Sequence, residues 1–297
     1  MSAEEWNCSS SSGNFTRAND CQLGGEILLA GDLSIFGRHG LTTVIAKADN
    51  RHFRLSTETL SLTYLNLTGG NAGNGGSIFV DSSGGARVVI RVCSFCNNRA
   101  DHGGSIYGWD TSSITIYDSN ITDSVAKYRG GGLYMNEGAV NLTRVLIRNN
   151  KQQQSGVNFD DGGGAVYAVY SSNLQIRESS FVGNYAKNQG HVLMTHQSDE
   201  NGSPSVTVVN TRFKPCDACT DWSQTSFYSY KNVSQVAYAQ NLCSAGPCSL
   251  GPYTGTCRER KNFHGVLCLP VSTCTLGNSA FFELGPTMSA EIGRAHV

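Results

Sequence analysis

A short glycine-containing motif that returns about every 28 residues constrains this chain more than any other feature. Each copy is a glycine pair followed by a small, an aliphatic and an aromatic residue. The copies are Gly75-Gly76-Ser77-Ile78-Phe79, Gly103-Gly104-Ser105-Ile106-Tyr107, Gly130-Gly131-Gly132-Leu133-Tyr134 and Gly163-Gly164-Ala165-Val166-Tyr167, with a decayed copy at Gly190-His191-Val192-Leu193. A repeat of this length indicates a solenoid, in which each unit buries its apolar face only by stacking on its neighbours.

A second motif, an apolar residue followed three positions later by asparagine, precedes the glycine pairs. It is complete at Phe95…Asn98 and Phe181…Asn184, and nearly so at Ile147…Asn150. We expect the apolar residues to form one inward stack. The asparagines should form a ladder at a turn, where amides of successive coils bond one another.

Between these motifs the chain alternates apolar and polar residues, as in Ser113-Ile114-Thr115-Ile116-Tyr117. Period-two alternation indicates strands with one buried face. We predict three short strands per coil, and coils stacked with the roughly 4.8 Å spacing of paired strands. The chain is therefore predicted to be all-β, with a right-handed, single-stranded parallel β-helix over residues 23–215.

The glycine-pair and Phe-x-x-Asn motifs together resemble the repeats of chlamydial polymorphic outer membrane proteins. The run that ends in Leu65-Asn66-Leu67-Thr68-Gly69-Gly70 is similar to the opening coils of pectate-lyase-like β-helix proteins. The resemblance covers roughly residues 30–216 and implies a β-helix used for adhesion or surface display. The chain departs from the bacterial family in its cysteine-rich end, which suits a eukaryotic secreted protein better than an autotransporter.

The segments outside the repeats are expected to differ in structure from the β-helix. We interpret residues 1–22 as a cap or truncated N-terminal segment without a signal peptide, and residues 216–278 as a disulfide-stapled module. Residues 279–297 are a doubtful tail, and 292–297 matches the read-through of a sequencing adapter. No stretch of the chain reaches the roughly 20 apolar residues of a membrane span.

Composition and modification motifs favour a secreted or cell-surface protein. The formal net charge is −1 and 15% of residues are charged, without a basic patch, so nucleic acid is a poor partner. The disulfide candidates are Cys8, Cys21, Cys93, Cys96, Cys216, Cys219, Cys243, Cys248, Cys257, Cys268 and Cys274. The expected glycosylation acceptors are Asn7, Asn14, Asn66, Asn120, Asn141 and Asn232, whereas Pro204 weakens the motif at Asn201.

The aromatic residues of the glycine motif are the best candidates for ligand binding. If the aliphatic residues point inward, Phe79, Tyr107, Tyr134 and Tyr167 point outward in a stack that small neighbours leave uncovered. Such an exposed ladder would suit sugar rings or a protein partner. The alternatives are that the rings only stabilise the stack, or that the faces are reversed.

Two neighbouring carboxylates, Asp160 and Asp161, are the candidates for catalysis. Paired acids can serve as acid and base or hold Ca²⁺, yet no basic residue is evident in register with them, and an acidic loop at a turn is the favoured explanation. Cys93-Ser-Phe-Cys96 and Cys216-Asp-Ala-Cys219 have zinc-like spacing, but disulfides are favoured in a secreted chain. For Cys93 and Cys96, which flank the inward Phe95, the alternatives are a local bridge and a covered free pair. We expect neither a metal nor a cofactor.

These observations favour a rigid extracellular binding or adhesion module for glycans or proteins over an enzyme. The alternative is a polysaccharide lyase or glycoside hydrolase that acts on a uronic-acid polymer. That alternative needs carboxylates with Lys or Arg on adjacent coils facing one groove.

Overall fold

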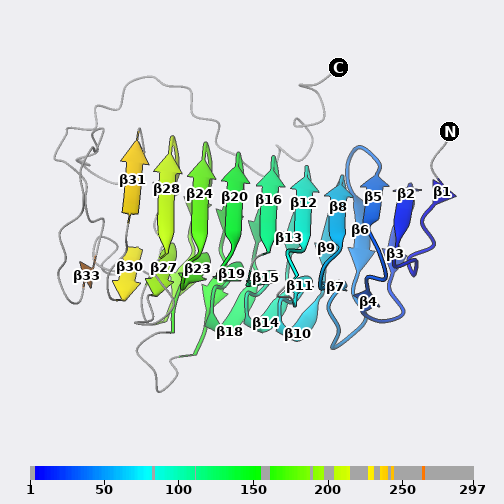
Figure 1. Ribbon diagram of the computed structural model, residues 1–297, viewed down its shortest axis with the longest axis horizontal. Helices are drawn as coiled ribbons and strands as arrows, with labels where there is room; N and C mark the ends of the chain where they lie inside the picture. Colours follow the sequence, from blue (N-terminus) through cyan, green and yellow to red (C-terminus); the bar gives the residue numbers. More distant parts are fainter. Residues whose placement is uncertain are drawn as a thin grey trace.

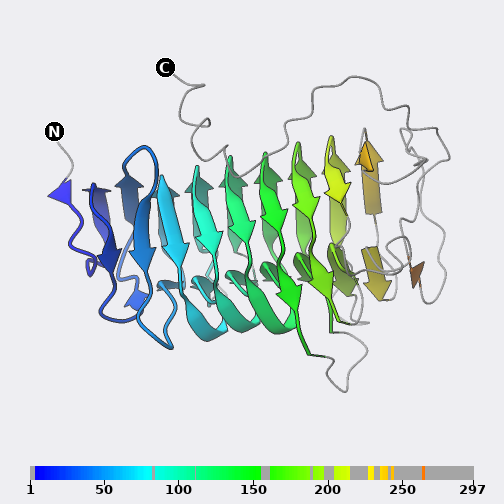
Figure 2. The same ribbon diagram turned by 180° about the vertical axis from the view of Figure 1, so that it is seen from behind.

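The structure is a computed structural model in which the chain forms a stack of parallel β-coils. It describes residues 4–81, 84–110, 112–154, 161–187, 190–196 and 204–214, and the strands at 227–230, 235–239, 242–243 and 263–264. These segments contain strands and no helix, and the strands form four sheets (Figures 1 and 2). Every strand pairing is parallel, except that of β30 with β33. The predictions of an all-β chain and of parallel stacking are confirmed.

Three long sheets run the length of the stack, here named A, B and C. Sheet A consists of β1 (Glu4–Glu5), β2 (Gly13–Arg17), β5 (Leu33–Gly37), β8 (Thr59–Thr63), β12 (Arg87–Arg91), β16 (Ser113–Tyr117), β20 (Ala139–Thr143), β24 (Asn173–Arg177), β28 (Ser205–Val209) and β31 (Gln235–Ala239). Sheet B consists of β3 (Cys21–Gln22), β6 (Thr42–Ile45), β9 (Leu65–Thr68), β13 (Ser94–Cys96), β17 (Asn120–Thr122), β21 (Leu146–Arg148), β25 (Ser180–Val182), β29 (Arg212–Lys214) and β32 (Leu242–Cys243). Sheet C consists of β4 (Ile27–Leu28), β7 (Phe53–Leu55), β11 (Ile78–Val80), β15 (Ile106–Trp109), β19 (Leu133–Asn136), β23 (Val166–Val169), β27 (Leu193–His196), β30 (Phe227–Tyr230) and β33 (Phe263–His264).

A fourth, shorter sheet, named D, is added in the central coils. It consists of β10 (Asn71–Asn74), β14 (Arg99–His102), β18 (Val125–Arg129), β22 (Lys151–Gln152) and β26 (Tyr185–Ala186). The prediction of three strands per coil is therefore wrong for this part of the stack. Strands of two to five residues such as Arg99–His102 show too little apolar alternation to be recognised.

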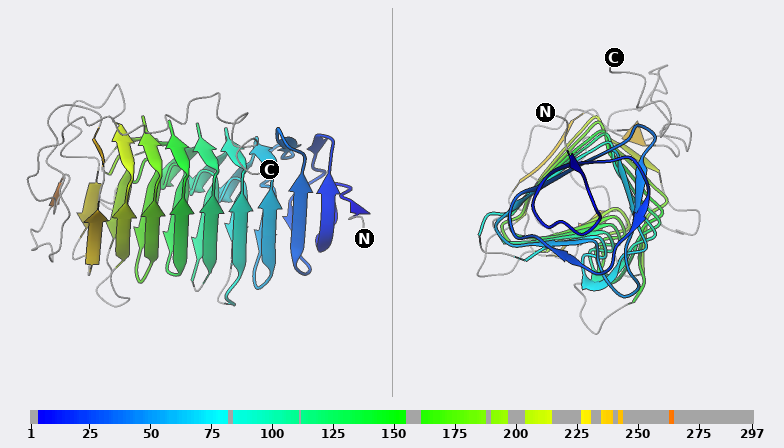
Figure 3. Two further views of the ribbon diagram at one scale, coloured as in Figure 1. Left: turned by 90° about the horizontal axis from the view of Figure 1, so that it is seen from above. Right: turned by 90° about the vertical axis from the view of Figure 1, so that its right-hand side faces the viewer.

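Each central coil passes from sheet A to B, then to D, then to C. Seen along the axis, the coils superimpose as one closed outline (Figure 3). Strands outside the expected range 23–215 belong to the same sheets, because β1 and β2 pair into sheet A and β31 follows β28. At the N-terminal end the fully buried Trp6 packs against Phe53, with ring centroids 6.1 Å apart. The apolar core therefore begins within the first coil.

The inward apolar columns form one continuous core. In sheet B the column Leu67, Phe95, Ile121, Ile147 and Phe181 is in register and fully buried, which confirms the predicted inward stack. In sheet A the inward and outward residues alternate as the sequence indicates. Burial of these columns is the main stabilising contribution, because each fully buried Leu, Ile or Phe contributes about 2 kcal/mol.

The predicted asparagine ladder lies at the turn between sheets B and D. Asn98, Asn150 and Asn184 are each at most 2% exposed. The Asn150 amide nitrogen donates to the carbonyl oxygen of Ile121 at 2.8 Å and to Asn184 Oδ1 at 3.1 Å, and Asn184 Oδ1 also accepts from the Asn150 N–H at 3.0 Å. Ser124 interrupts the ladder between Asn98 and Asn150, and its N–H donates to Asn150 Oδ1 at 3.0 Å. The ladder is confirmed, with this one interruption.

Many turns of the coils contain a residue with positive φ, and the turn between sheets A and B is unusual in the residues that adopt it. They are Tyr64, Val92, Asp118, Arg144, Glu178 and Asn210, with φ between 49° and 56°. Val92 is the least suited of them, because a β-branched side chain crowds the backbone in this region. This position therefore carries local backbone strain.

Replacing Val92 with asparagine is expected to raise the free energy of unfolding by about 1 kcal/mol, because asparagine tolerates positive φ. Urea denaturation of the whole chain measures the change. The control is Val89→Asn, which changes an outward, half-buried valine in the middle of the neighbouring strand β12 and should bring no gain. A Val92→Asn chain no more stable than the parent would contradict the strain.

His52 is a titratable group buried within the stack. Its ring is fully buried, and Nε2 donates to the carbonyl oxygen of Val44 at 3.0 Å. Burial lowers the pKa of His52 from 6.5 to about 4. The folded protein therefore keeps this imidazole neutral under mildly acidic conditions.

Lowering the pH from 6.5 to 4 is expected to reduce the free energy of unfolding through His52. In this window the unfolded chain binds a proton at His52 that the folded chain does not, so the loss amounts to roughly 3 kcal/mol. Urea denaturation at successive pH values measures it. His52→Gln should remove this contribution, whereas His39→Gln, at an exposed histidine, should leave it in place. An unchanged pH profile in His52→Gln would refute the assignment.

Candidate binding surface

The four predicted aromatic residues form a column on the outward side of sheet C. The pairs Phe79–Tyr107, Tyr107–Tyr134 and Tyr134–Tyr167 are in register on adjacent strands. The Tyr107 and Tyr134 rings are nearly parallel, with centroids 4.7 Å apart, and those of Tyr134 and Tyr167 are 5.3 Å apart. The predicted outward stack is confirmed.

The expectation that these rings are uncovered is wrong. Tyr107, Tyr134 and Tyr167 are 3%, 4% and 0% exposed, and only Phe79 is partly exposed. Side chains from sheet D lie against them, since the His102 ring is 5.7 Å from that of Tyr134 and the Arg129 guanidinium lies 5.6 Å from the Tyr167 ring. The tyrosines therefore form a second, smaller apolar cluster beside the main core.

The tyrosine hydroxyls are held neutral inside this cluster. Burial raises the pKa of Tyr134 to about 12 and raises that of Tyr107 as well. The Tyr167 hydroxyl is 3.1 Å from Nδ1 of His196. The cluster therefore packs against sheet C, and the rings of Tyr107, Tyr134 and Tyr167 have no face open to solvent.

The accessible aromatic residue of this surface is Trp109, which the sequence analysis missed. It lies at the end of β15, 45% exposed, and its ring packs 6.0 Å from that of Tyr107 at an angle of 27°. The signal was present in Tyr107-Gly108-Trp109, because period-two alternation places the first and third residues on the same side. The repeated glycine motif ends at Tyr107, so a search for that motif does not include Trp109.

Polar groups lie on both sides of Trp109 along the stack. Asn136 pairs with Trp109 in the next coil, and Asp81 follows Val80, which pairs with Gly108 in the preceding coil. Asp81 also forms an ion pair with Arg54. Asn136 is only 8% exposed, so the accessible groups are the indole and the Asp81 carboxylate. An exposed indole beside a carboxylate suits a hydroxyl-rich ligand, because the ring takes apolar C–H faces and the carboxylate takes hydroxyls.

The predicted acidic pair is only partly within the described residues. Asp160 lies outside them, and Asp161 is 4% exposed. Oδ1 of Asp161 is 3.2 Å from Nε of Arg129, on the adjacent coil. The interpretation that the pair has no basic partner in register is therefore wrong for Asp161. Its burial nevertheless withdraws this carboxylate from a ligand in solvent.

The cysteines divide into three groups. Cys8 and Cys21 form a disulfide with an S–S distance of 2.10 Å, as expected. Cys93 and Cys96 are free cysteines, so the prediction of a disulfide between them is wrong and they form a free pair. Of the remaining candidates, only the backbone of Cys243 is described; Cys216, Cys219, Cys248, Cys257, Cys268 and Cys274 lie outside the described residues.

At the turn between sheets A and B, Cys93 occupies the position that Ser119 and Ser179 occupy in later coils. Its Sγ accepts from the Leu65 N–H and donates to the carbonyl oxygen of Arg91 at 3.2 Å. Ser119 and Ser179 make the same donor contact to the residue two before them. Burial raises the pKa of the Cys93 thiol to about 12, which keeps it protonated and unreactive.

The glycosylation motifs follow the strand alternation. Asn14 and Asn141 lie on the outward side of sheet A, and Asn66 and Asn120 on that of sheet B. Asn7 lies before the N-terminal disulfide, where its Oδ1 accepts the Ser9 and Ser10 N–H groups, and Asn232 lies outside the described residues. Their occupancy stays a prediction.

Comparison with protein-family models, curated proteins and solved structures finds no match for this chain. Within the described segments there is no helix with the length and apolar character needed to cross a membrane. Nor do three His, Cys, Asp or Glu side chains gather in these segments as a metal site would require. The fold and the surface described above therefore carry the functional argument.

Asp161→Asn is expected to lower the free energy of unfolding by about 2 kcal/mol, because it removes a buried carboxylate that pairs with the partly buried Arg129 guanidinium. Chemical denaturation measures the loss. Asp118→Asn is the matched control: it breaks the more exposed pair with Arg144 and should cost less than about 1 kcal/mol. Equal losses in the two variants would show that burial of the Asp161 pair is not decisive.

Proposed function

We propose that this chain is an extracellular binding or adhesion module, a right-handed parallel β-helix that holds a glycan on the outward side of sheet C. The observation that carries the proposal is Trp109, a 45% exposed indole fixed on a strand and flanked by Asp81 and Asn136. The ring and the Asp81 carboxylate lie on successive coils, and Asn136, which is only 8% exposed, lies beside the ring on the next coil. A ligand would therefore meet a preorganised surface with little ordering cost on binding.

The scaffold supports this role in several ways. The right-handed sense is favoured because connections between parallel strands of one sheet are almost always right-handed. The resemblance to chlamydial polymorphic outer membrane repeats and to pectate-lyase-like β-helices points to the same fold and to surface display. The disulfide between Cys8 and Cys21 fits an oxidising compartment, and a cysteine-rich extension over 216–278 would suit it too.

Binding is favoured over catalysis by the state of the only described acid of the predicted pair. Asp161 is buried and paired with Arg129, so it is unavailable as an acid, a base or a ligand for Ca²⁺. Sugar recognition by an aromatic ring and fixed polar groups requires no such carboxylate. The proposal therefore assigns contact with the ligand to Trp109 and Asp81.

Trp109→Ala is expected to weaken glycan binding about tenfold while the fold is kept, because the variant loses stacking area at an exposed site. The chain, secreted from an oxidising host, is screened on a glycan array, and the hits are measured by calorimetry. The control is Ile45→Ala, which removes a 41% exposed apolar side chain from sheet B and should leave affinity unchanged. Circular dichroism and thermal melting verify both folds.

Three outcomes would contradict the proposal. Equal affinity in Trp109→Ala and the parent would remove sheet C as the binding surface. New reducing ends or unsaturated products formed from uronate polymers would make the protein an enzyme. Absence of glycan binding by the parent would contradict the glycan assignment and leave a protein partner as the remaining choice.

A further inference from the structure

The outward side of sheet A contains no acidic residue across seven consecutive strands. From β5 to β28 its charged side chains are Arg87, Arg91 and Arg177. The whole chain, by contrast, has 23 acidic and 22 basic residues. We propose that this face, separate from the surface around Trp109, binds a linear polysaccharide that carries sulfate or carboxylate groups.

The middle outward column of this face is made for hydrogen bonding. It reads Ser34, Ser61, Val89, Thr115, Asn141, Gln175 and Thr207, each in register with the next. Six of these seven side chains are hydroxyls or amides, and none is charged. A linear polymer lying along the column would meet such groups in steps of about 4.8 Å, the spacing of paired strands, except at Val89 and at Thr115, which is only 9% exposed.

The arginines frame this column on both sides. Arg87 and Arg91 are the two ends of β12, about 13 Å apart along the strand, and Arg177 is in register with Arg91 three strands further, about 14 Å away. The Arg91 guanidinium lies 4.6 Å from the Tyr117 ring, which fixes its position on the face. All three side chains belong to exposed residues.

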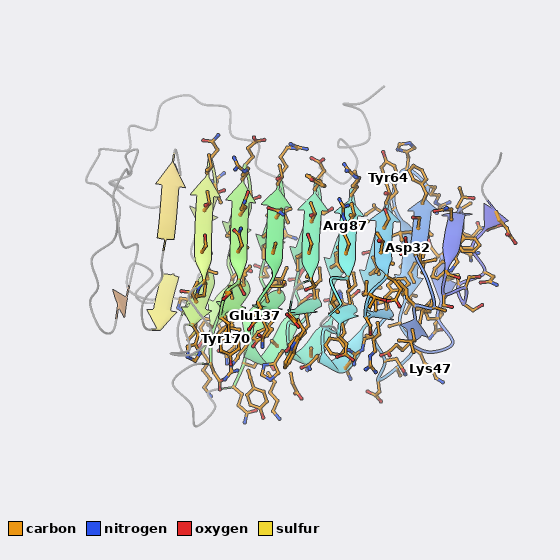
Figure 4. All side chains as sticks on the ribbon, viewed as in Figure 1. Asp32, Lys47, Tyr64, Arg87, Glu137 and Tyr170 are labelled. Carbon is orange, nitrogen blue, oxygen red and sulfur yellow. A yellow bond between two sulfur atoms is a disulfide. The ribbon has the colours of Figure 1, made fainter. Side chains whose placement is uncertain are left out.

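Several carboxylates at the borders of the face already have partners. Asp118 and Glu178 are held by Arg144 in the turn that follows the strands, at 2.6 Å and 3.7 Å. Asp32 accepts the Thr59 N–H at 2.7 Å (Figure 4). Glu137 lies in the turn before β20, at the opposite end of the strands from Tyr64 (Figure 4). Repulsion of an anionic ligand is thereby confined to the border.

The spacing of the cations favours a polysaccharide over a nucleic acid. A nucleic-acid strand carries one charge about every 3.4 Å and is held by dense basic clusters. Three arginines about 13 to 14 Å apart match a polymer with sparse charges, and the hydroxyl and amide groups between them match its neutral parts. The net charge of −1 adds no general attraction for polyanions.

The proposal also predicts the glycosylation state of Asn141, which lies in the middle of this face and is a predicted glycosylation acceptor. A glycan there would cover the column between Arg91 and Arg177. In protein secreted by a eukaryotic host, peptide mapping should therefore find Asn141 unmodified. Full occupancy of Asn141 would overturn the proposal.

The affinity test uses the full chain from a periplasmic host that does not attach N-glycans. Binding to immobilised heparin, polygalacturonate, neutral dextran and single-stranded DNA is measured at two salt concentrations. The test variant is Arg87→Gln/Arg91→Gln/Arg177→Gln. The control Lys47→Gln/Arg99→Gln/Lys151→Gln removes three exposed positive charges away from sheet A, so the two variants have equal net charge.

We expect salt-sensitive binding to heparin or polygalacturonate, weakened about tenfold in the sheet A variant and unchanged in the control. Which of the two polymers binds identifies sulfate or carboxylate as the group recognised. Equal weakening in both variants, binding to DNA as tight as to the polysaccharides, or no binding to either polysaccharide would overturn the proposal. Trp109→Ala should leave this binding intact, so failure of the sheet C proposal is distinguishable from failure of this one.

Discussion

The close approach of successive coils at the glycine pairs is the constraint on which the rest of the structure depends. At Gly104, an added Cβ would lie 2.1 Å from the carbonyl oxygen of Gly131 on the next coil, and at Gly103, with φ of 62°, it would lie 3.2 Å from the Cβ of Tyr134 there. No side chain fits this space, so the pair requires glycine. The approach brings sheet D against the outward side of sheet C, and this is what covers the tyrosine column.

The same geometry separates the surfaces of the solenoid by role. In the angle between sheets C and D, the tyrosines, His102 and Arg129 pack together and become part of the support. Trp109, two residues after Tyr107 on the same strand, lies beyond this cover and stays open. Within the described residues no strand covers the outward side of sheet A, so most of its outward side chains remain at least partly exposed along the stack. Both proposed surfaces are thus those that sheet D leaves uncovered.

The features of the fold that could be predicted are those in which one residue type is required at one place. Glycine at the close approach, asparagine in the ladder and an apolar residue in the sheet B stack each recur in the sequence for a direct steric or hydrogen-bonding reason. The turn between sheets A and B could not be read in this way. Tyr64, Val92, Arg144 and Glu178 all adopt positive φ there, because the stacking of whole coils overrides their local preference.

The candidate site was less predictable, because alternation gives the side of a strand and not what lies above it. The outward direction of Tyr107 and Tyr134 was correct, but their cover comes from His102 and Arg129, which precede sheet C in the coil and carry no alternation signal. Asp161 shows the same limit. It lies beside the Arg129 of the previous coil, 32 residues earlier, because an insertion before the glycine pair lengthens that coil. In a solenoid, exposure is decided between coils, so surfaces of the sheets have to be assigned after the stacking is known.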